Sequence, residues 1–262
     1  MDMKKIILVL LFAIPFVSCI GWNVKGNVGS SHIKFISGKS DVYDAEVEYL
    51  ELGEKGAYID THYHAVAGLG FEFQMSMAFY SGYWNIYIPF GFVNDWRGGD
   101  TRTYALGWRI NYQSVSLGVI IGDGRLSYTS ASGFISKGVP AGDVVTVSFY
   151  PDSNMFSVDD TMASNGNVLT YDSETRNVWT MRLFQCIANG LEVQNTNTAP
   201  VGFRLHRAIL TLDGVVVRDY VPVRIGEGES TVGLMYDRVS GELFGNEGTG
   251  YFIVGPDKEE VE

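Results

Sequence analysis

The chain has 262 residues, 46% of them hydrophobic, and a formal net charge of −11. This length and apolar content suit one large all-β domain as well as two small domains, and the 31 glycines fit a fold with many tight turns. Because the charge is strongly negative, the surface repels phosphate backbones, which excludes nucleic acid as an expected partner.

Residues 1–18 have the pattern of a bacterial export signal. Two lysines precede an apolar run over residues 6–17, which is shorter than the ~20 residues that a membrane-spanning helix needs. The Phe-Val-Ser-Cys sequence ending at Cys19 resembles a lipoprotein box, with phenylalanine where leucine is usual. The resemblance implies cleavage before Cys19 and its lipidation, which would anchor the protein at the bacterial outer membrane or cell surface. The alternative is an ordinary secretory signal followed by a chance cysteine.

The rest of the chain divides into a tether, one domain and a short tail. Residues 19–45 are rich in glycine and serine, so we expect a tether after the lipid anchor. Residues 46–256 are the predicted domain, and residues 257–262 are an acidic tail. The other cysteine, Cys186, lies in a strand-like run, where it is expected to be a buried small hydrophobe. With Cys19 acylated, no disulfide framework is expected.

From residue 46 onward, short segments of strand character are separated by clusters of Gly, Asn, Asp and Ser. No long segment has a helical period, so the pattern predicts an all-β sandwich or jelly roll. Strands are expected at residues 46–52, 57–60, 70–79, 84–92, 105–112, 116–121, 125–130, 144–150, 155–158, 167–171 and 180–187.

The clearest alternation is in residues 70–79. Every second residue there is large and apolar, so these side chains share one face of a strand and are expected in the core. They are Phe71, Phe73, Met75, Met77 and Phe79.

The C-terminal stretch, residues 206–255, predicts two hairpins and a closing strand. The first hairpin turns at Asp213-Gly214, because an Asp-Gly pair supplies the two positive-φ positions that a two-residue turn needs. The second turns at Ser240-Gly241, and a glycine-rich segment over residues 245–250 then leads into the closing strand. The strands are expected at residues 207–212, 215–220, 233–239, 242–244 and 251–254.

This stretch also carries a family resemblance. The sequences LDGVVVRDYVPVR and GLMYDRVSGELFGNEGTGYF resemble the end of concanavalin A-like lectin/glucanase domains of the LamG-like kind, and residues 47–51 and 57–61 resemble their opening strands. The resemblance implies a concanavalin A-like jelly-roll β-sandwich of two antiparallel sheets. It also implies a cell-surface protein that binds glycan non-covalently.

Aromatic residues gather in the middle third of the chain, most suggestively in the loop over residues 94–102. Aromatic rings stack on the apolar faces of sugars, while nearby Asp, Asn and Arg side chains bond the hydroxyls. The candidate ligand-binding residues are Asn94, Asp95, Trp96, Arg97, Asp100, Arg102 and Tyr104. The alternative is that this loop is a solvated connection and that the strand tryptophans pack in the core.

Metal sites have little support in the sequence. Domains of this kind often bind calcium through loop oxygens, but no Asp-x-Asp-x-Asp-Gly loop is present among the available aspartates. His62 and His64 fall two apart on an expected strand, and would need a third ligand to chelate zinc. The aspartates available to calcium are Asp95, Asp100, Asp159 and Asp160. No cofactor is therefore expected, with calcium as the alternative that the resemblance leaves open.

Catalysis is the rival function, because laminarinase-type glucanases share the sandwich. They need two inward carboxylates in a Glu-x-Asp-x-x-Glu motif, about 5 Å apart for retaining chemistry. The nearest match, residues 46–51, lacks the Asp and matches the opening strand, where its acidic residues are expected to face solvent. The sequence therefore predicts no enzyme. The alternatives to a glycan-binding protein are an adhesive or structural surface protein that binds another protein and, less favoured, a glycoside hydrolase.

Overall fold

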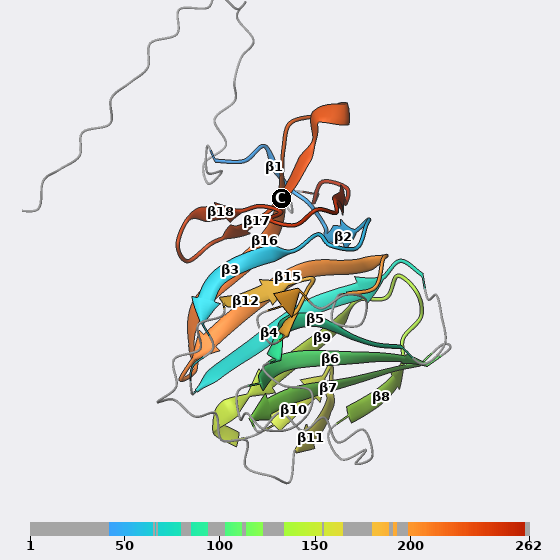
Figure 1. Ribbon diagram of the computed structural model, residues 1–262, viewed down its shortest axis with the longest axis vertical. Helices are drawn as coiled ribbons and strands as arrows, with labels where there is room; N and C mark the ends of the chain where they lie inside the picture. Colours follow the sequence, from blue (N-terminus) through green and yellow to red (C-terminus); the bar gives the residue numbers. More distant parts are fainter. Residues whose placement is uncertain are drawn as a thin grey trace, which may run out of the picture. The chain divides into compact units, whose positions relative to one another are not determined.

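The computed structural model describes residues 42–64, 66, 68–79, 85–93, 103–111, 114–122, 134–153, 155–164, 180–188, 191–192 and 199–259. They belong to one compact unit that spans residues 40–262. The helical elements among them are two short 3-10 turns, η1 (Pro151–Ser153) and η2 (Gly228–Ser230). The strands form two sheets, which confirms the predicted all-β sandwich (Figure 1).

The larger sheet has 11 strands. Most of them lie side by side in the order β11-β10-β9-β4-β15-β16-β17-β18, while β1 pairs with β16 and β2 pairs with both β15 and β19. The strands are β1 (Ala45–Glu46), β2 (Leu50–Leu52), β4 (Leu69–Met77), β9 (Val145–Tyr150), β10 (Met155–Val158), β11 (Thr161–Ser164), β15 (Phe203–Leu212), β16 (Val215–Ile225), β17 (Val232–Asp237), β18 (Glu242–Phe244) and β19 (Phe252–Val254).

The smaller sheet has 8 strands. Six of them lie in the order β14-β13-β5-β6-β7-β8, and β12 pairs with both β5 and β3. Neighbouring strands in this sheet are antiparallel, except that β13 and β5 run parallel. The strands are β3 (Ile59–His64), β5 (Asn85–Val93), β6 (Thr103–Asn111), β7 (Ser114–Gly122), β8 (Phe134–Gly138), β12 (Thr180–Leu183), β13 (Ile187–Ala188) and β14 (Leu191–Glu192). The sequence did not predict β8, β11 or β14, and the strands predicted at residues 125–130 and 167–171 lie outside the described residues.

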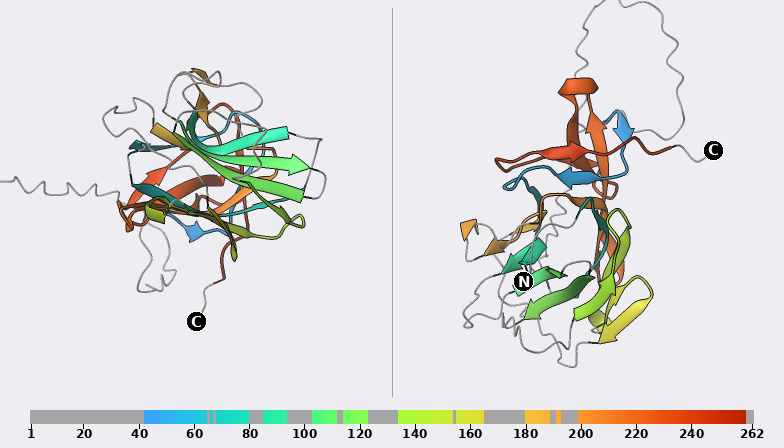
Figure 2. Two further views of the ribbon diagram at one scale, coloured as in Figure 1. Left: turned by 90° about the horizontal axis from the view of Figure 1, so that it is seen from below. Right: turned by 90° about the vertical axis from the view of Figure 1, so that its right-hand side faces the viewer.

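The core lies between the two sheets, which the right-hand view of Figure 2 shows as two layers. Phe73 of β4 stacks on Phe71, with ring centroids 4.8 Å apart, and meets Phe90 of β5 edge to face at 4.5 Å. Met75 and Met77 are buried on the same face of β4, as predicted. Aromatic pairs in these geometries stabilise the fold by more than the burial of their apolar area alone. The Phe cluster therefore holds the two sheets together.

Phe79 does not belong to this core, although the alternation placed it there. The side chain is 45% exposed, because β4 ends at Met77. The next backbone N–H, that of Ala78, donates to the carbonyl of Gly202. The chain therefore leaves the sheet before Phe79, and that prediction is wrong.

The first C-terminal hairpin is confirmed. β15 and β16 pair in antiparallel fashion around Asp213 and Gly214, which have φ angles of 49° and 77°. Both turn residues thus occupy the positive-φ region that a two-residue hairpin needs.

The second hairpin turns earlier than predicted. Strand β17 ends at Asp237 rather than at Val239, because the Asp237 carboxylate accepts the backbone N–H groups of Val239 and Ser240. Those two N–H groups are therefore not available to the sheet. The turn closes at Gly241, where φ is 77°, and β18 begins where it was expected.

Two strands that were predicted as continuous are broken. Between β1 and β2 the chain changes partners: Glu48 donates its N–H to Pro256, and Tyr49 accepts the N–H of Gly255. In the segment predicted as residues 180–187, Phe184 has a φ of 68°, which ends β12 before β13 begins. Cys186 in this segment is fully buried, as predicted.

The two segments that carry the family resemblance contact each other. The Asn246 side-chain oxygen accepts the Tyr58 N–H at 3.2 Å, and the Glu247 N–H donates to the Tyr58 carbonyl at 3.0 Å. A Cβ at Gly248 would lie 1.7 Å from the Gly56 carbonyl oxygen, so only glycine fits there. These signature residues hold the opening and closing segments together.

Candidate functional site

The predicted binding loop, residues 94–102, connects β5 to β6 and lies outside the described residues. Val93 and Thr103, which flank it, are paired across the two strands, so the loop closes a hairpin of the smaller sheet. Tyr104 lies on β6, opposite Phe92 of β5 and Ile121 of β7. The other candidates, which stay predictions, are Asn94, Asp95, Trp96, Arg97, Asp100 and Arg102.

Within the described residues, polar and charged side chains gather on the face of the larger sheet that is turned away from the core. Side chains alternate along a strand, so the residues between the buried positions of β4 point to this face. Strand pairing sets Ser76 beside Arg204, and Arg204 beside Glu51 of β2. We call this surface the outer polar face; its members are Tyr49, Glu51, Glu72, Gln74, Ser76, Arg204, His206, Arg207 and Asp219.

The centre of the outer polar face is a bidentate ion pair. Arg207 Nε lies 2.8 Å from one carboxylate oxygen of Asp219, and Arg207 Nη2 lies 2.9 Å from the other. The hydrogen bond to Asp219 raises the pKa of the Arg207 guanidinium, and Glu72 adds to the effect through its charge. Two parallel charge-assisted bonds fix both groups in one plane, so this pair is preorganised.

A second ion pair lies beside a tyrosine. Arg204 Nε donates to Glu51 at 2.7 Å, and the guanidinium carbon lies 4.2 Å from the centroid of the Tyr49 ring. Glu51 is only 7% exposed, so the expectation that the acidic residues of 46–51 face solvent is wrong for it, although Glu48 is exposed. Burial is tolerated because Arg204 neutralises the carboxylate.

A serine and a histidine lie at the edge of the same face. Ser76 Oγ is 2.8 Å from His206 Nε2, and which of the two groups donates depends on the tautomer of the ring. This is the geometry of a nucleophile with its base, but Ser76 is only 1% exposed, so a substrate carbonyl does not reach its hydroxyl. We interpret the pair as structural.

Burial of the His206 ring lowers its pKa from 6.5 to about 4. As the pH falls from 6.5 to about 4, the unfolded chain therefore gains a proton that the folded chain does not, and stability declines through this window. Because the ring is partly exposed, we expect a loss on the order of 1–2 kcal/mol. The measurement is the urea midpoint of the wild type and of His206→Gln between pH 7 and pH 4.

The variant should show a smaller decline than the wild type. Val215→Gln is the matched control, because the Val215 side chain is 66% exposed and carries no titrating group, so its replacement should leave the decline unchanged. Parallel curves for the wild type and His206→Gln would contradict the assignment.

In the part of the chain that the structure describes, no three His, Cys, Asp or Glu side chains gather as a metal site would require. His62 lies 3.3 Å from Glu247 rather than in a pair with His64. Asp159 accepts the Thr146 N–H at 2.8 Å and so belongs to a turn. Asp95 and Asp100 lie outside the described residues.

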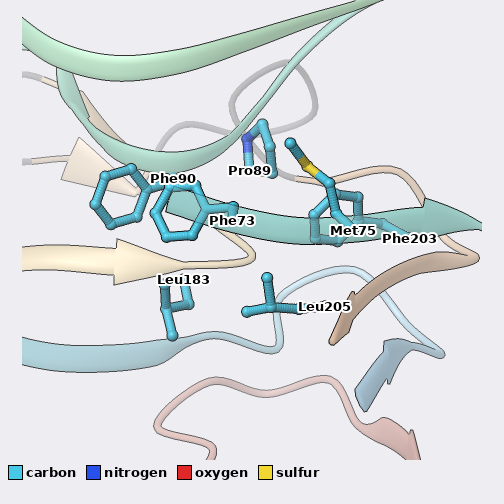
Figure 3. A pocket seen from close by; sticks show the side chains of 7 residues that line it. All are labelled: Phe73, Met75, Pro89, Phe90, Leu183, Phe203 and Leu205. Carbon is cyan, nitrogen blue, oxygen red and sulfur yellow. The ribbon is translucent and has the colours of Figure 1, made fainter. Parts of the chain in front are cut away.

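A small apolar cavity of about 10 Å³ lies between the sheets, as Figure 3 shows. A space of this size holds about one water molecule, and an apolar lining leaves it dry. The cavity is therefore too small for a sugar. The lining residues are Phe73, Met75, Pro89, Phe90, Leu183, Phe203 and Leu205.

Sequence reasoning missed the outer polar face because its members are distant along the chain. Ser76 and His206 are 130 positions apart, and Glu51 and Arg204 are 153 apart. The one local signal is the polar residue between each pair of apolar core positions in Phe-Glu-Phe-Gln-Met-Ser, which marks an outward face without naming its neighbours.

The fold and this face define an all-β sandwich with a preorganised polar surface on its larger sheet. The chain matches no known protein-family model, and no curated protein matches it. No helix among the described residues is long and apolar enough to cross a membrane.

Proposed function

We propose that the chain is an exported, lipid-anchored surface protein whose concanavalin A-like sandwich binds glycan non-covalently. The observation that carries this proposal is the outer polar face, where two ion pairs lie on neighbouring strands of one sheet and Tyr49, just before β2, lies against one of them. The resemblance of both chain ends to lectin/glucanase domains favours the same ligand class.

The chemistry of this face suits sugar hydroxyls, which both donate and accept hydrogen bonds. A carboxylate has about four acceptor sites and a guanidinium has five N–H donors, so the paired groups retain sites for a ligand. Because Asp219 and Glu51 already hold their arginines, these side chains lose little conformational entropy when a ligand binds. Tyr49 lies against Arg204 and offers part of an aromatic ring.

The test is a glycan-array screen of the purified chain, with and without calcium, for the wild type and for Glu72→Gln. Glu72 lies on the outer polar face, on β4, between β9 and the strand β15 that carries the two paired arginines. We expect its substitution to weaken glycan binding about 10-fold, a loss of about 1.4 kcal/mol. Glu242→Gln, on the edge strand β18, is the matched control and should bind as the wild type does.

A Trp96→Ala variant separates the two candidate surfaces. If it alone abolishes binding, the site lies in the loop over residues 94–102. Absence of binding to any glycan would contradict the proposal and favour a role in binding another protein.

The lipid anchor is tested separately. We expect the wild type to incorporate labelled fatty acid and to fractionate with membranes, and Cys19→Ala to do neither. Cys186→Ala is the control, because this buried cysteine follows no export signal and its loss should leave labelling intact. Equal labelling of the wild type and Cys19→Ala would contradict the anchor.

A further inference from the structure

We infer that the glycan bound by the outer polar face is uncharged, in preference to glycans that carry uronate, sialate or sulfate groups. This inference deepens the proposed function and rests on it. Three features of the described residues support this inference. They are the pairing of the arginines, the charge balance of the face, and the hydrogen-bonding groups that the ion pairs leave unused and that sugar hydroxyls can bind.

Five arginines of the described residues are already held by carboxylates. On the outer polar face, Arg207 uses both Nε and Nη2 on Asp219, and Arg204 uses Nε on Glu51. Elsewhere the same pattern recurs. Three more arginine–carboxylate pairs are Arg218–Asp237, Arg224–Asp257 and Arg238–Glu46. Arg182 is different, since it donates to Gln185 and lies over the Tyr58 ring.

An acidic sugar that took an arginine away from its partner would leave that partner without its counter-charge. The partner carboxylates are largely buried: Asp219 has 14% of its side chain exposed and Glu51 has 10%. Removing the arginine would leave such a carboxylate poorly solvated and unpaired, at a cost that generally exceeds the gain from a new surface contact. These preformed ion pairs therefore disfavour the binding of an anion that would open them.

The charge balance of the face points the same way. Its two arginines face the carboxylates of Glu51, Glu72 and Asp219, so carboxylates are in excess. His206 adds no positive charge near neutral pH, because burial lowers its pKa to about 4. The whole chain carries a formal net charge of −11, which repels a polyanion at distances beyond direct contact.

Uncharged sugars meet no such penalty. Their hydroxyls donate to carboxylate oxygens and accept from the guanidinium N–H groups that the ion pairs leave unused. Gln74 lies opposite Arg207 in the strand register and adds an amide that does both. The face thus matches adjacent hydroxyl groups without requiring any ion pair to open.

The experiment compares the wild-type chain against neutral, acidic and cationic polysaccharides at 20 mM and 300 mM NaCl by isothermal titration calorimetry. The neutral probes are β-glucan, mannan and galactan; the acidic probes are polygalacturonate and chondroitin sulfate; the cationic probe is chitosan. We expect at least 10-fold tighter binding of one neutral polymer than of either acidic one, and less than a two-fold change between the two salt concentrations.

Glu72→Lys provides a gain-of-function arm, with Glu72→Gln as its matched control. The lysine variant should acquire salt-sensitive binding to polygalacturonate, because it reverses one charge of the face, whereas the glutamine variant should not. Tighter binding of an acidic or cationic polymer than of any neutral polymer by the wild type would overturn the inference and leave glycan binding standing. Binding to none of the polymers would overturn the proposed function as well.

Discussion

Replacing Asp237 by alanine is expected to lower the free energy of unfolding by about 3–5 kcal/mol. The carboxylate is completely buried, and it accepts the backbone N–H groups of Asp219, Val239 and Ser240 at 2.9, 3.1 and 3.2 Å. Its removal leaves these donors without a partner and also leaves Arg218, 3.5 Å away, beside an empty space. Urea unfolding monitored by tryptophan fluorescence measures the loss.

Two further variants define what Asp237 contributes. Asp237→Asn keeps the shape and one acceptor oxygen but removes the charge, so we expect a loss of about half that of alanine, roughly 1.5–2.5 kcal/mol. Asp160→Ala, at an exposed turn position, should change stability by less than about 0.5 kcal/mol. An Asp237→Ala protein as stable as the Asp160→Ala protein would show that the carboxylate does not hold the hairpin.

The second large effect is expected from Phe73→Ala, which should lower the free energy of unfolding by about 3–5 kcal/mol. Phe73 joins the two sheets, since it stacks on Phe71 of its own strand and meets Phe90 of the opposite sheet at 4.5 Å. Its ring also lines the small apolar cavity, so alanine enlarges an existing void instead of letting the core collapse. The urea midpoint at constant m-value measures the effect.

Phe73→Leu is the matched control, because it keeps an apolar side chain of nearly the same reach and should cost about 1–1.5 kcal/mol. Tyr150→Ala removes a ring of similar size from the same sheet, but 46% of that side chain is exposed, so a loss well under 2 kcal/mol is expected. Equal losses for Phe73→Ala and Tyr150→Ala would show that the Phe cluster does not bind the sheets together.

The predictions that succeeded rest on local chemistry. The hairpin at Asp213-Gly214 is a property of those two residues, whose positive φ angles need no support from the rest of the chain. The alternation from Phe71 to Met77 likewise specifies one buried face, whatever strands lie beside it.

The predictions that failed depended on distant contacts. Phe79 leaves the strand because Gly202 takes the N–H of the preceding residue, and the early turn after Asp237 follows from the bonds of a buried carboxylate. Neither event changes the local pattern of apolar residues, so periodicity does not reveal it.

By itself, the sequence determined that the chain forms β-strands, where the first C-terminal hairpin turns, and which side of β4 enters the core. These follow from side-chain alternation and turn preferences that act over a few residues. Only the tertiary structure decided that β2 lies beside β15 and that β15 lies beside β4, which brings Glu51, Arg204 and Ser76 into one row. Such pairing depends on which distant segments bury their apolar faces together, and this is a property of the whole folded chain.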